Sequence, residues 1–567
     1  MRWLFAIAAF SGMVAGQEPA SVILISIDTL RADHLSVYGY RKIQTPNIDS
    51  FAQQGTVFTN VNSQIPLTLP SHTSLMTSTY PFENGLEENA EIVPAGAVTL
   101  ASILRSHGYK TAAFVGSNML ERRCGLDQGF EEYDSPFGGA RVRRDGALVL
   151  RAAGVWLAAH RNQPVFLFVH LFDLHTPYQL SHQLSRGKGT NEPETTGYDA
   201  ELSYVDQILG RFRQALIDNG WWKKSMVVVL ADHGESLGDH GELSHGYFIY
   251  ESTLHVPLIF HWPDGAAKHP EKIGEPAGLI DVAPTVLDAL HLAIPRPYDG
   301  VSLLNNGAHG IYSESVYARD SFRWAALRSL RRGRWKYIEA PHAELFDLEK
   351  DPIEQSNLLR GNEAVAASMR SELSRLMAGH ARGNPPPAHD SSEATKKIME
   401  SLGYLSGGSR KPAKREGPDP KDRLAEYQMY DRALDAMYSQ RLDGAIRGFL
   451  QVLARDQDNL AARGSLGDAY LRYGKPDDAV REWSTALKSD PQYAPAAEAL
   501  GEFYIRRADW RKACPYLLLA LAAAPGDSTV RGELQVVVEH LRTDCKESPS
   551  SVACSKLREA ERELAPK

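Results

Sequence analysis

Short runs of β-branched and aromatic residues alternate with longer, helix-like stretches over the first 300 residues of the chain. Continuous apolar runs at 22–27, 111–115, 165–170 and 226–230 are typical of strands that are buried on both faces. The segments between these runs leave room for crossover helices, which connect parallel strands. The pattern therefore predicts an α/β unit in which a mostly parallel sheet is sandwiched by helices.

Polar residues stand where the predicted strands end. In α/β sheets, ligands bind outside the carboxyl ends of the strands, so we expect a single site there. The polar residues that follow the four runs are Asp28, Asn118, Asp173, His175, Asp232 and His233.

The pattern changes after residue 300. We predict a core over 17–300 and a small subdomain over 301–380, in which short strand-like runs occur at 335–338 and 344–348. Residues 381–422 are rich in Gly, Pro, Ser and charge, which is typical of a linker.

A repeat of 34 residues occupies the last part of the chain, and Leu466, Gly467 and Tyr470 recur as Leu500, Gly501 and Tyr504. This period resembles the tetratricopeptide pattern, in which small residues let paired helices approach. We predict repeats at 425–458, 459–492 and 493–526 and a capping helix, so that 423–567 form an all-α solenoid. Such repeats bind a peptide or protein partner, or serve as a packing spacer or dimer interface.

The N-terminal residues 1–16 have the pattern of an export signal, with Arg2 before a short apolar run and small residues before Gln17. The run is shorter than the ~20 apolar residues that span a bilayer. We therefore expect an exported protein, periplasmic or secreted, and not a transmembrane one; the alternative is a cytoplasmic start with an apolar first strand. Cys545 and Cys554 could form a disulfide in an oxidising compartment.

Composition and charge limit the partners. The chain has 567 residues, of which 43% are hydrophobic, enough for a large core and a further domain. Its formal net charge of −8 gives no sign of a polyanion partner, so we expect no nucleic acid.

The loop at 65–77 carries Pro70 between Thr68 and His72. Together with Asp28 and the 232–235 motif, it resembles the core of the sulfatase family, a branch of the alkaline phosphatase superfamily. The resemblance covers residues 21–360. It implies an alkaline-phosphatase-like fold with a small C-terminal subdomain, a divalent metal and ester hydrolysis.

Thr68 stands where sulfatases hold the cysteine or serine that is oxidised to formylglycine. Threonine is not a recognised substrate for that maturation, so no formylglycine is expected. A threonine at this position resembles the metal-bound nucleophile of superfamily phosphodiesterases and phosphoryl-group transferases. The hydroxyl of threonine has a high pKa, and coordination by a dication would lower it. One acid of the family is replaced by Ile27. The implied metal ligands are Asp28, Thr68, Asp232 and His233, and the candidate ions are Zn²⁺, Mn²⁺ and Ca²⁺.

Around the predicted nucleophile, the sequence lacks cationic residues that sulfatases have. Ser117 and Met119 replace two cations of the family, and Asn118 between them could donate a hydrogen bond to a substrate oxyanion. His72 replaces an arginine beside the nucleophile and is placed among the catalytic residues. His175 and His245 are predicted to bind substrate, protonate the leaving group and contact the oxyanion.

A second metal is one further prediction, with Asp173, His175 and His245 as its ligands. The alternative is a set of hydrogen-bonding histidines around a single metal.

We therefore expect a metal-dependent hydrolase of sulfate or related esters, acting on a small-molecule, glycan or lipid ester. The alternative is a phosphodiesterase, phosphonate monoester hydrolase or phosphoryl-group transferase that uses metal-bound Thr68. A second alternative is a non-catalytic scaffold for the repeats.

Overall fold

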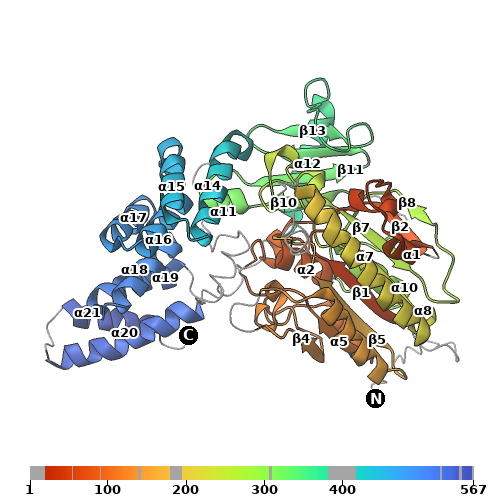
Figure 1. Cartoon of the computed structure of the whole chain (residues 1–567), viewed down its shortest axis with the longest axis horizontal. Helices are drawn as coiled ribbons and strands as arrows, with labels where there is room; N and C mark the ends of the chain where they lie inside the picture. Colours follow the sequence, from red (N-terminus) through yellow and green to blue (C-terminus); the bar gives the residue numbers. More distant parts are fainter. Residues whose placement is uncertain are drawn as a thin grey trace, which may run out of the picture.

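The computed structural model shows an α/β unit up to residue 380 and a helical unit from residue 417 (Figure 1). The described residues are 20–53, 55–89, 91–137, 142–178, 194–305, 309–380, 417–523, 527–547 and 552–564. The predicted signal segment (1–16) and residues 381–416 of the predicted linker lie outside them.

A nine-stranded sheet, counted over the described residues, forms the centre of the α/β unit in the order β4-β3-β5-β1-β6-β7-β2-β8, with β9 beside β2. Strands β1, β3, β4, β5 and β6 pair in parallel, whereas β7 runs antiparallel to β6 and β2. The predicted, mostly parallel sheet is thus confirmed. Its strands are β1 (Ser21–Ile27), β2 (Gly55–Asn62), β3 (Lys110–Phe114), β4 (Glu132–Asp134), β5 (Val165–Leu171), β6 (Ser225–Leu230), β7 (His255–His261), β8 (Lys272–Ile273) and β9 (Ala277–Gly278).

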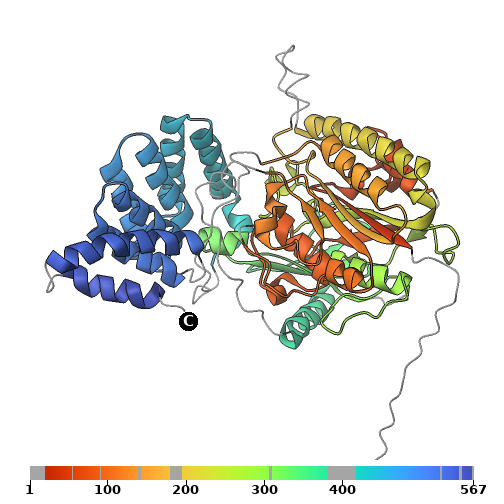
Figure 2. The ribbon, with the colours of Figure 1, turned by 90° about the horizontal axis from the view of Figure 1, so that it is seen from below.

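Helices cover both faces of this sheet (Figure 2). One face carries α1 (Pro46–Ala52), α5 (Gly146–Ala159), α7 (Glu194–Asp218) and α8 (Trp221–Lys224). The other face carries α2 (Thr68–Thr77), α3 (Pro81–Asn84), α4 (Leu100–Ser106) and α10 (Val282–Ala289). Every residue of β1, β5 and β6 is buried between these layers. Burial on both faces explains why these strands read as continuous apolar runs.

A smaller antiparallel sheet follows, in the order β10-β11-β12-β13. Its elements are β10 (Ile311–Ser315), α11 (Tyr317–Phe322), β11 (Leu327–Arg332), β12 (Trp335–Glu339), β13 (Glu344–Asp347) and α12 (Glu363–Gly379). The strand-like runs predicted at 335–338 and 344–348 correspond to β12 and β13. Apolar residues of α12 pack on β11 and β12 and close a separate small core.

The helical unit is a solenoid of helix pairs, as predicted. Its helices are α14 (Leu424–Tyr438), α15 (Leu442–Arg455), α16 (Leu460–Arg472), α17 (Pro476–Ser489), α18 (Ala494–Ile505), α19 (Trp510–Ala523), α20 (Ser528–Glu547) and α21 (Val552–Leu564). The second helices of the first three pairs begin at Leu442, Pro476 and Trp510, at the period of the sequence repeat. Gly501 permits close packing, because a Cβ there would lie 2.6 Å from Leu517 Cδ2. The tetratricopeptide assignment itself stays a prediction.

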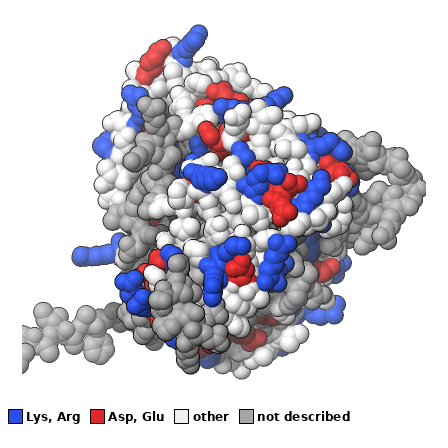
Figure 3. Space-filling view, turned by 90° about the vertical axis from the view of Figure 1, so that its left-hand side faces the viewer, with Lys and Arg blue, Asp and Glu red and all other residues white. Residues whose placement is uncertain are grey.

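Basic and acidic side chains are interspersed on the described part of the end face of the molecule (Figure 3). None of the helices in the described ranges combines the length and the hydrophobicity that crossing a membrane requires.

Candidate active site

The carboxyl ends of β1 and β6 bring the first predicted site residues together. Asp28 follows β1 directly, and its backbone N–H donates to Leu171 O at the end of β5 (2.9 Å). The chain then turns sharply at Thr29, whose φ of 56° lies in the left-handed region. Thr29 N–H donates to Asp232 Oδ1 (3.3 Å), so the turn after β1 is tied to the end of β6.

Thr68 is the first residue of α2 and is fully buried. Its hydroxyl donates to Asp28 Oδ2 (3.3 Å) and lies 3.5 Å from His233 Nε2. Few free backbone donors remain in this first turn, because Leu69 N–H donates to Asn89 Oδ1 (2.9 Å), Ser71 N–H donates to Leu67 O (3.0 Å) and Pro70 has no N–H. The structure thus gathers Thr68, Asp28, Asp232 and His233 at one point.

Three of these residues have the chemistry of metal ligands. One ligand atom each from Asp28, Asp232 and His233 lies within 4.8 Å of the other two. Asp28 Oδ1 and Asp232 Oδ2 are buried without a hydrogen-bond partner. His233 Nδ1 lies 2.9 Å from Gly234 O, and since a carbonyl only accepts, Nδ1 donates and Nε2 keeps its lone pair. These residues fit a divalent metal.

Burial shifts the pKa values of these three residues. It raises the pKa of Asp28 to about 6 and also raises the pKa of Asp232, which the neighbouring Asp28 raises further. Burial alone would lower the pKa of His233, but Asp232 and Asp28 outweigh it, and the pKa is raised. Two adjacent buried carboxylates are costly without a cation, which again fits a dication.

His72 lies one turn after Thr68 in α2 and contacts the backbone of Thr68. Its Nδ1 is 2.7 Å from Thr68 O and its Nε2 is 2.9 Å from Ser26 Oγ. Because the carbonyl accepts, Nδ1 donates to it and Nε2 accepts from the serine hydroxyl. The pKa of His72 is lowered to about 4 by burial. His72 therefore holds the first turn of α2 against β1, and the structure places neither of its nitrogens on the Thr68 hydroxyl.

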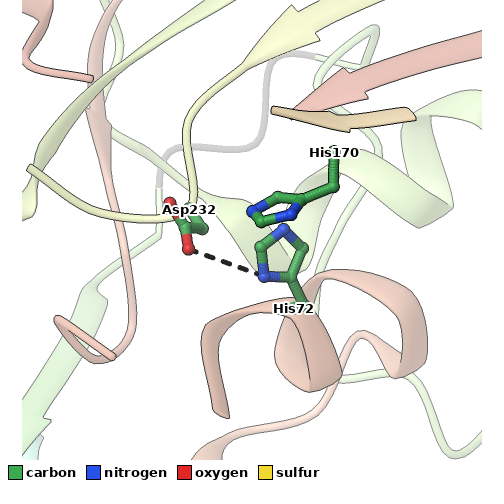
Figure 4. A group of neighbouring side chains, drawn as sticks. All are labelled: His72, His170 and Asp232. Carbon is green, nitrogen blue, oxygen red and sulfur yellow. Dashed lines mark ion pairs between the residues drawn. The ribbon is translucent and has the colours of Figure 1, made fainter. Parts of the chain in front are cut away.

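His170 is a site residue that the sequence interpretation missed. It lies in β5 opposite Ser26, next to His72 and Asp232 (Figure 4), and burial lowers its pKa to about 4. His170 Nε2 is 3.2 Å from Asp28 Oδ2. The signal was one polar residue inside an otherwise apolar, fully buried strand. The group His72, His170 and Asp232 is close enough to suit a metal, but both nitrogens of His72 already form hydrogen bonds.

His175 and His245 meet on the other side of His233. The His245 ring lies 4.4 Å from the His233 ring and 5.1 Å from the His175 ring, centroid to centroid. His245 Nδ1 is 3.1 Å from Glu235 Oε1, a buried partner that the predicted site lacked. Burial lowers the pKa of both His175 and His245 well below the usual value, which makes both rings neutral near pH 7.

Arg143 is a further residue that the sequence interpretation missed. Its guanidinium donates to the carbonyl oxygens of His175 (3.1 Å), Thr176 (2.8 Å) and Pro177 (3.0 Å). These three bonds fix the backbone of the loop that carries His175. Arg143 lies more than thirty positions before these residues in the chain and belongs to no motif, so no sequence signal pointed to it.

Asn118 and Asp173 differ in the hydrogen bonds that their side chains form. Asn118 is buried in a short 3₁₀ turn that packs on α2, and neither atom of its amide has a hydrogen-bond partner. It is therefore able to contact an oxyanion. Asp173 instead accepts from Gly146 N–H (3.1 Å) at the start of α5. Among the described residues, the groups whose ligand atoms lie within 4.8 Å of one another do not include the set Asp173, His175 and His245.

The fold is of the alkaline-phosphatase-like type, and its site gathers residues that fit a divalent metal. Residues 20–292 match the family model described as Sulfatase, and residues 238–379 match that of the C-terminal part of N-sulphoglucosamine sulphohydrolase. The α/β unit is therefore sulfatase-like, and the chain is a hydrolase that acts on ester bonds.

Individual proteins agree with these matches. An arylsulfatase of Clostridium perfringens is 24% identical over 455 residues, covering 60% of this chain and 91% of the relative. A Δ4,5-hexuronate-2-O-sulfatase of Bacteroides thetaiotaomicron is 22% identical over 61% of this chain and 85% of its own length. The solved phosphonate monoester hydrolase of Agrobacterium radiobacter shares the fold, with a TM-score of 0.53, 20% identity and coverage of 64% of this chain and 96% of its own.

Proposed function

We propose that this chain hydrolyses sulfate or related esters with Thr68 as nucleophile, at a divalent metal held by Asp28, Thr68, Asp232 and His233. The observation that carries the proposal is the buried Thr68 hydroxyl between Asp28 Oδ2 and His233 Nε2. Two unpartnered carboxylate oxygens beside it support a metal there. When bound, Zn²⁺, Mn²⁺ or Ca²⁺ supplies the positive charge that lowers the pKa of the Thr68 hydroxyl and offsets the carboxylates.

The residues divide the reaction between them. Thr68 Oγ forms a bond to the sulfur or phosphorus atom, and the bond from that atom to the ester oxygen breaks. Thr68 loses one proton and the departing alcohol gains one, and His245 or His175 transfers it. Water then cleaves the ester on Thr68, which restores the hydroxyl and releases sulfate from a sulfate ester, a phosphate monoester from a phosphodiester, or a phosphonate from a phosphonate monoester. In this proposal Asn118 donates to the oxyanion, which its unpartnered side-chain amide supports.

Charge balance limits the substrate class. Asp28 and Asp232 carry two negative charges, and one dication cancels them. Apart from His233, which is a proposed metal ligand, the histidines add little positive charge, because burial lowers the pKa of His170 to about 4 and that of His175 and His245 well below the usual value. A site near neutrality suits a monoanion better than a dianion. We therefore propose sulfate monoesters first and phosphodiesters or phosphonate monoesters as the second candidate.

The phosphorus-based candidate is supported by Ser117 and Met119, which stand in place of two cations of the sulfatase pattern. The solved phosphonate monoester hydrolase shares the fold, which leaves this candidate open for the present chain. Transfer of the group to an acceptor other than water is part of the same candidate, since the ester on Thr68 would be common to both.

A substrate panel tests the proposal. Purified protein with Zn²⁺ or Mn²⁺ would be assayed on an aryl sulfate, a phosphodiester, a phosphonate monoester and a phosphate monoester. We expect turnover of at least one monoanion, little turnover of the dianionic phosphate monoester, and loss of activity in Thr68→Ala. Failure on all sulfate esters with turnover of the phosphorus monoanions would select the second candidate. A protein without bound metal by elemental analysis and without any turnover would instead be the non-catalytic scaffold.

We also propose that the protein is exported, to the periplasm or beyond, and that the helical unit binds a peptide or protein partner. Cys545 is disulfide-bonded, which supports an oxidising compartment. The repeat spacing supports the partner-binding role. Cell fractionation tests the first statement, and crosslinking of the tagged protein in cells tests the second.

A further inference from the structure

The loop that carries His245 is a closed turn at the edge of the active site. Its two sides are joined by hydrogen bonds from Ser236 N–H to Ser244 O (2.8 Å) and from Gly238 N–H to Glu242 O (2.9 Å). The buried Glu242 carboxylate accepts from the backbone N–H of Tyr247 (2.8 Å). The loop is therefore one compact piece, and a contact on any part of it bears on the position of His245.

Helix α14, the first helix of the solenoid, contacts this loop on both sides of His245. On one side, Gln428 Nε2 donates to Gly241 O (2.7 Å), and a Cβ at Gly241 would lie 2.6 Å from Leu424 Cδ2. On the other side, the rings of Tyr247 and Tyr427 are stacked, with centroids 4.1 Å apart and planes 7° apart.

The turn before α14 adds a polar contact to the stack. Tyr247 hydroxyl donates to Pro420 O (2.6 Å), so its ring is held at both its face and its tip. Tyr427 and Tyr430 belong to the same buried cluster as Tyr247, Phe248 and Tyr250. The α/β unit and the first helix pair thus share one hydrophobic core, which a flexibly tethered domain would not do.

We propose that α14 is a positioning element of the active site, in which Tyr427 and Gln428 hold the 241–247 loop so that His245 stays beside His233 and His175. This inference rests on the proposed function, because His245 matters only if it serves the reaction. It assigns to the solenoid a role within catalysis, in addition to any partner it binds. Catalysis is sensitive to such support, since small displacements of catalytic groups cost large factors in rate.

The test compares two stacked tyrosine pairs in full-length protein. In Tyr427→Ala we expect kcat to fall by about tenfold or more with a smaller change in KM, because the loss affects His245 and not the metal ligands. Tyr427→Phe keeps the ring and should restore kcat. The control is Tyr516→Ala, which removes a similar stack on Tyr504 (centroids 5.8 Å apart) within the solenoid. Its kcat should stay within about twofold of the wild type.

Wild-type kcat and KM in Tyr427→Ala would overturn the proposal, as would an equal loss in Tyr516→Ala. If Tyr427→Ala does not fold, Gln428→Ala carries the same test, because it removes only the bond to Gly241 O. Hydrogen exchange separates this inference from the proposed function. Amides of 241–248 should exchange faster in Tyr427→Ala than in Tyr516→Ala, even if no substrate in the panel is turned over.

Discussion

Removal of one carboxylate from the metal site should have opposite effects with and without metal. In metal-free protein, burial raises the pKa of Asp28 from 3.8 to about 6. Its folded-state pKa is above the unfolded value, so this group makes the protein less stable as the pH rises from about 4 through 6. The cost at pH 7.5 is about 3 kcal/mol. Asp28→Asn removes the charge with little change of shape, so it should raise the free energy of unfolding of the metal-free protein by about that amount.

The assay is thermal and urea unfolding at pH 7.5, in EDTA and with Zn²⁺ or Mn²⁺. In EDTA, Asp28→Asn should melt roughly 5 °C above the wild type. With metal at a thousandfold excess over its Kd, the wild type should gain about 4 kcal/mol and the variant much less, so that the order inverts. The gap in EDTA should shrink as the pH falls through 6 toward 4 and vanish below about 3, where the carboxyl is protonated in both states.

The matched control for this prediction is Asp173→Asn. Burial raises the pKa of Asp173 to about 7, but its carboxylate accepts from Gly146 N–H at the start of α5. This variant should therefore be stabilised equally with and without metal; dependence on metal would favour the second site that the sequence predicted. The reasoning on Asp28 is refuted if Asp28→Asn is less stable than the wild type in EDTA, or if both respond equally to metal.

Three more predictions follow from packing and charge. Gly467→Ala should destabilise the solenoid by about 1–3 kcal/mol in urea unfolding, because its Cβ would overlap Trp483 Nε1, whereas Gly532→Ala, with open space around it, should be neutral or stabilising. Burial raises the pKa of Glu83 to about 8, so the wild type loses stability as the pH rises from about 4.5 through 8. Glu83→Gln should then exceed the wild type in Tm at pH 9 but not at pH 4, and a gap independent of pH would contradict this. His170→Leu removes one of the two side-chain partners of Asp28 Oδ2 and should weaken zinc binding by about tenfold or more in a competition titration; unchanged affinity would show that His170 does not support the metal site.

Much of the fold was predictable because its strongest signals are local. The apolar runs at 22–27, 165–170 and 226–230 correspond to β1, β5 and β6, since strands buried on both faces need apolar residues throughout. The 34-residue spacing likewise placed the helix pairs of the solenoid. The antiparallel direction of β7 was not predicted, because strand direction depends on connections and packing that no short pattern records.

The candidate site was predictable only in part, for a related reason. The residues that follow strands, such as Asp28 and Asp232, were expected to meet because parallel strands end at one edge. His170 was missed because it lies within a strand, where its contact with Asp28 depends on the register of β5 against β1. The stacking of Tyr247 on Tyr427 joins positions 180 residues apart, and neither residue belongs to a catalytic motif.

The central claim is that Thr68 forms the covalent bond to substrate, and trapping that intermediate tests it most directly. Metal-loaded protein would be mixed with an aryl sulfate or a phosphodiester, quenched in acid during turnover, digested and examined by mass spectrometry. We predict on Thr68 a sulfuryl group from the aryl sulfate, or a phosphoryl group that keeps one ester from the phosphodiester, and neither in Thr68→Ala, which should also be inactive. Turnover by Thr68→Ala at the wild-type rate, with no modified Thr68 in the wild type, would contradict the account.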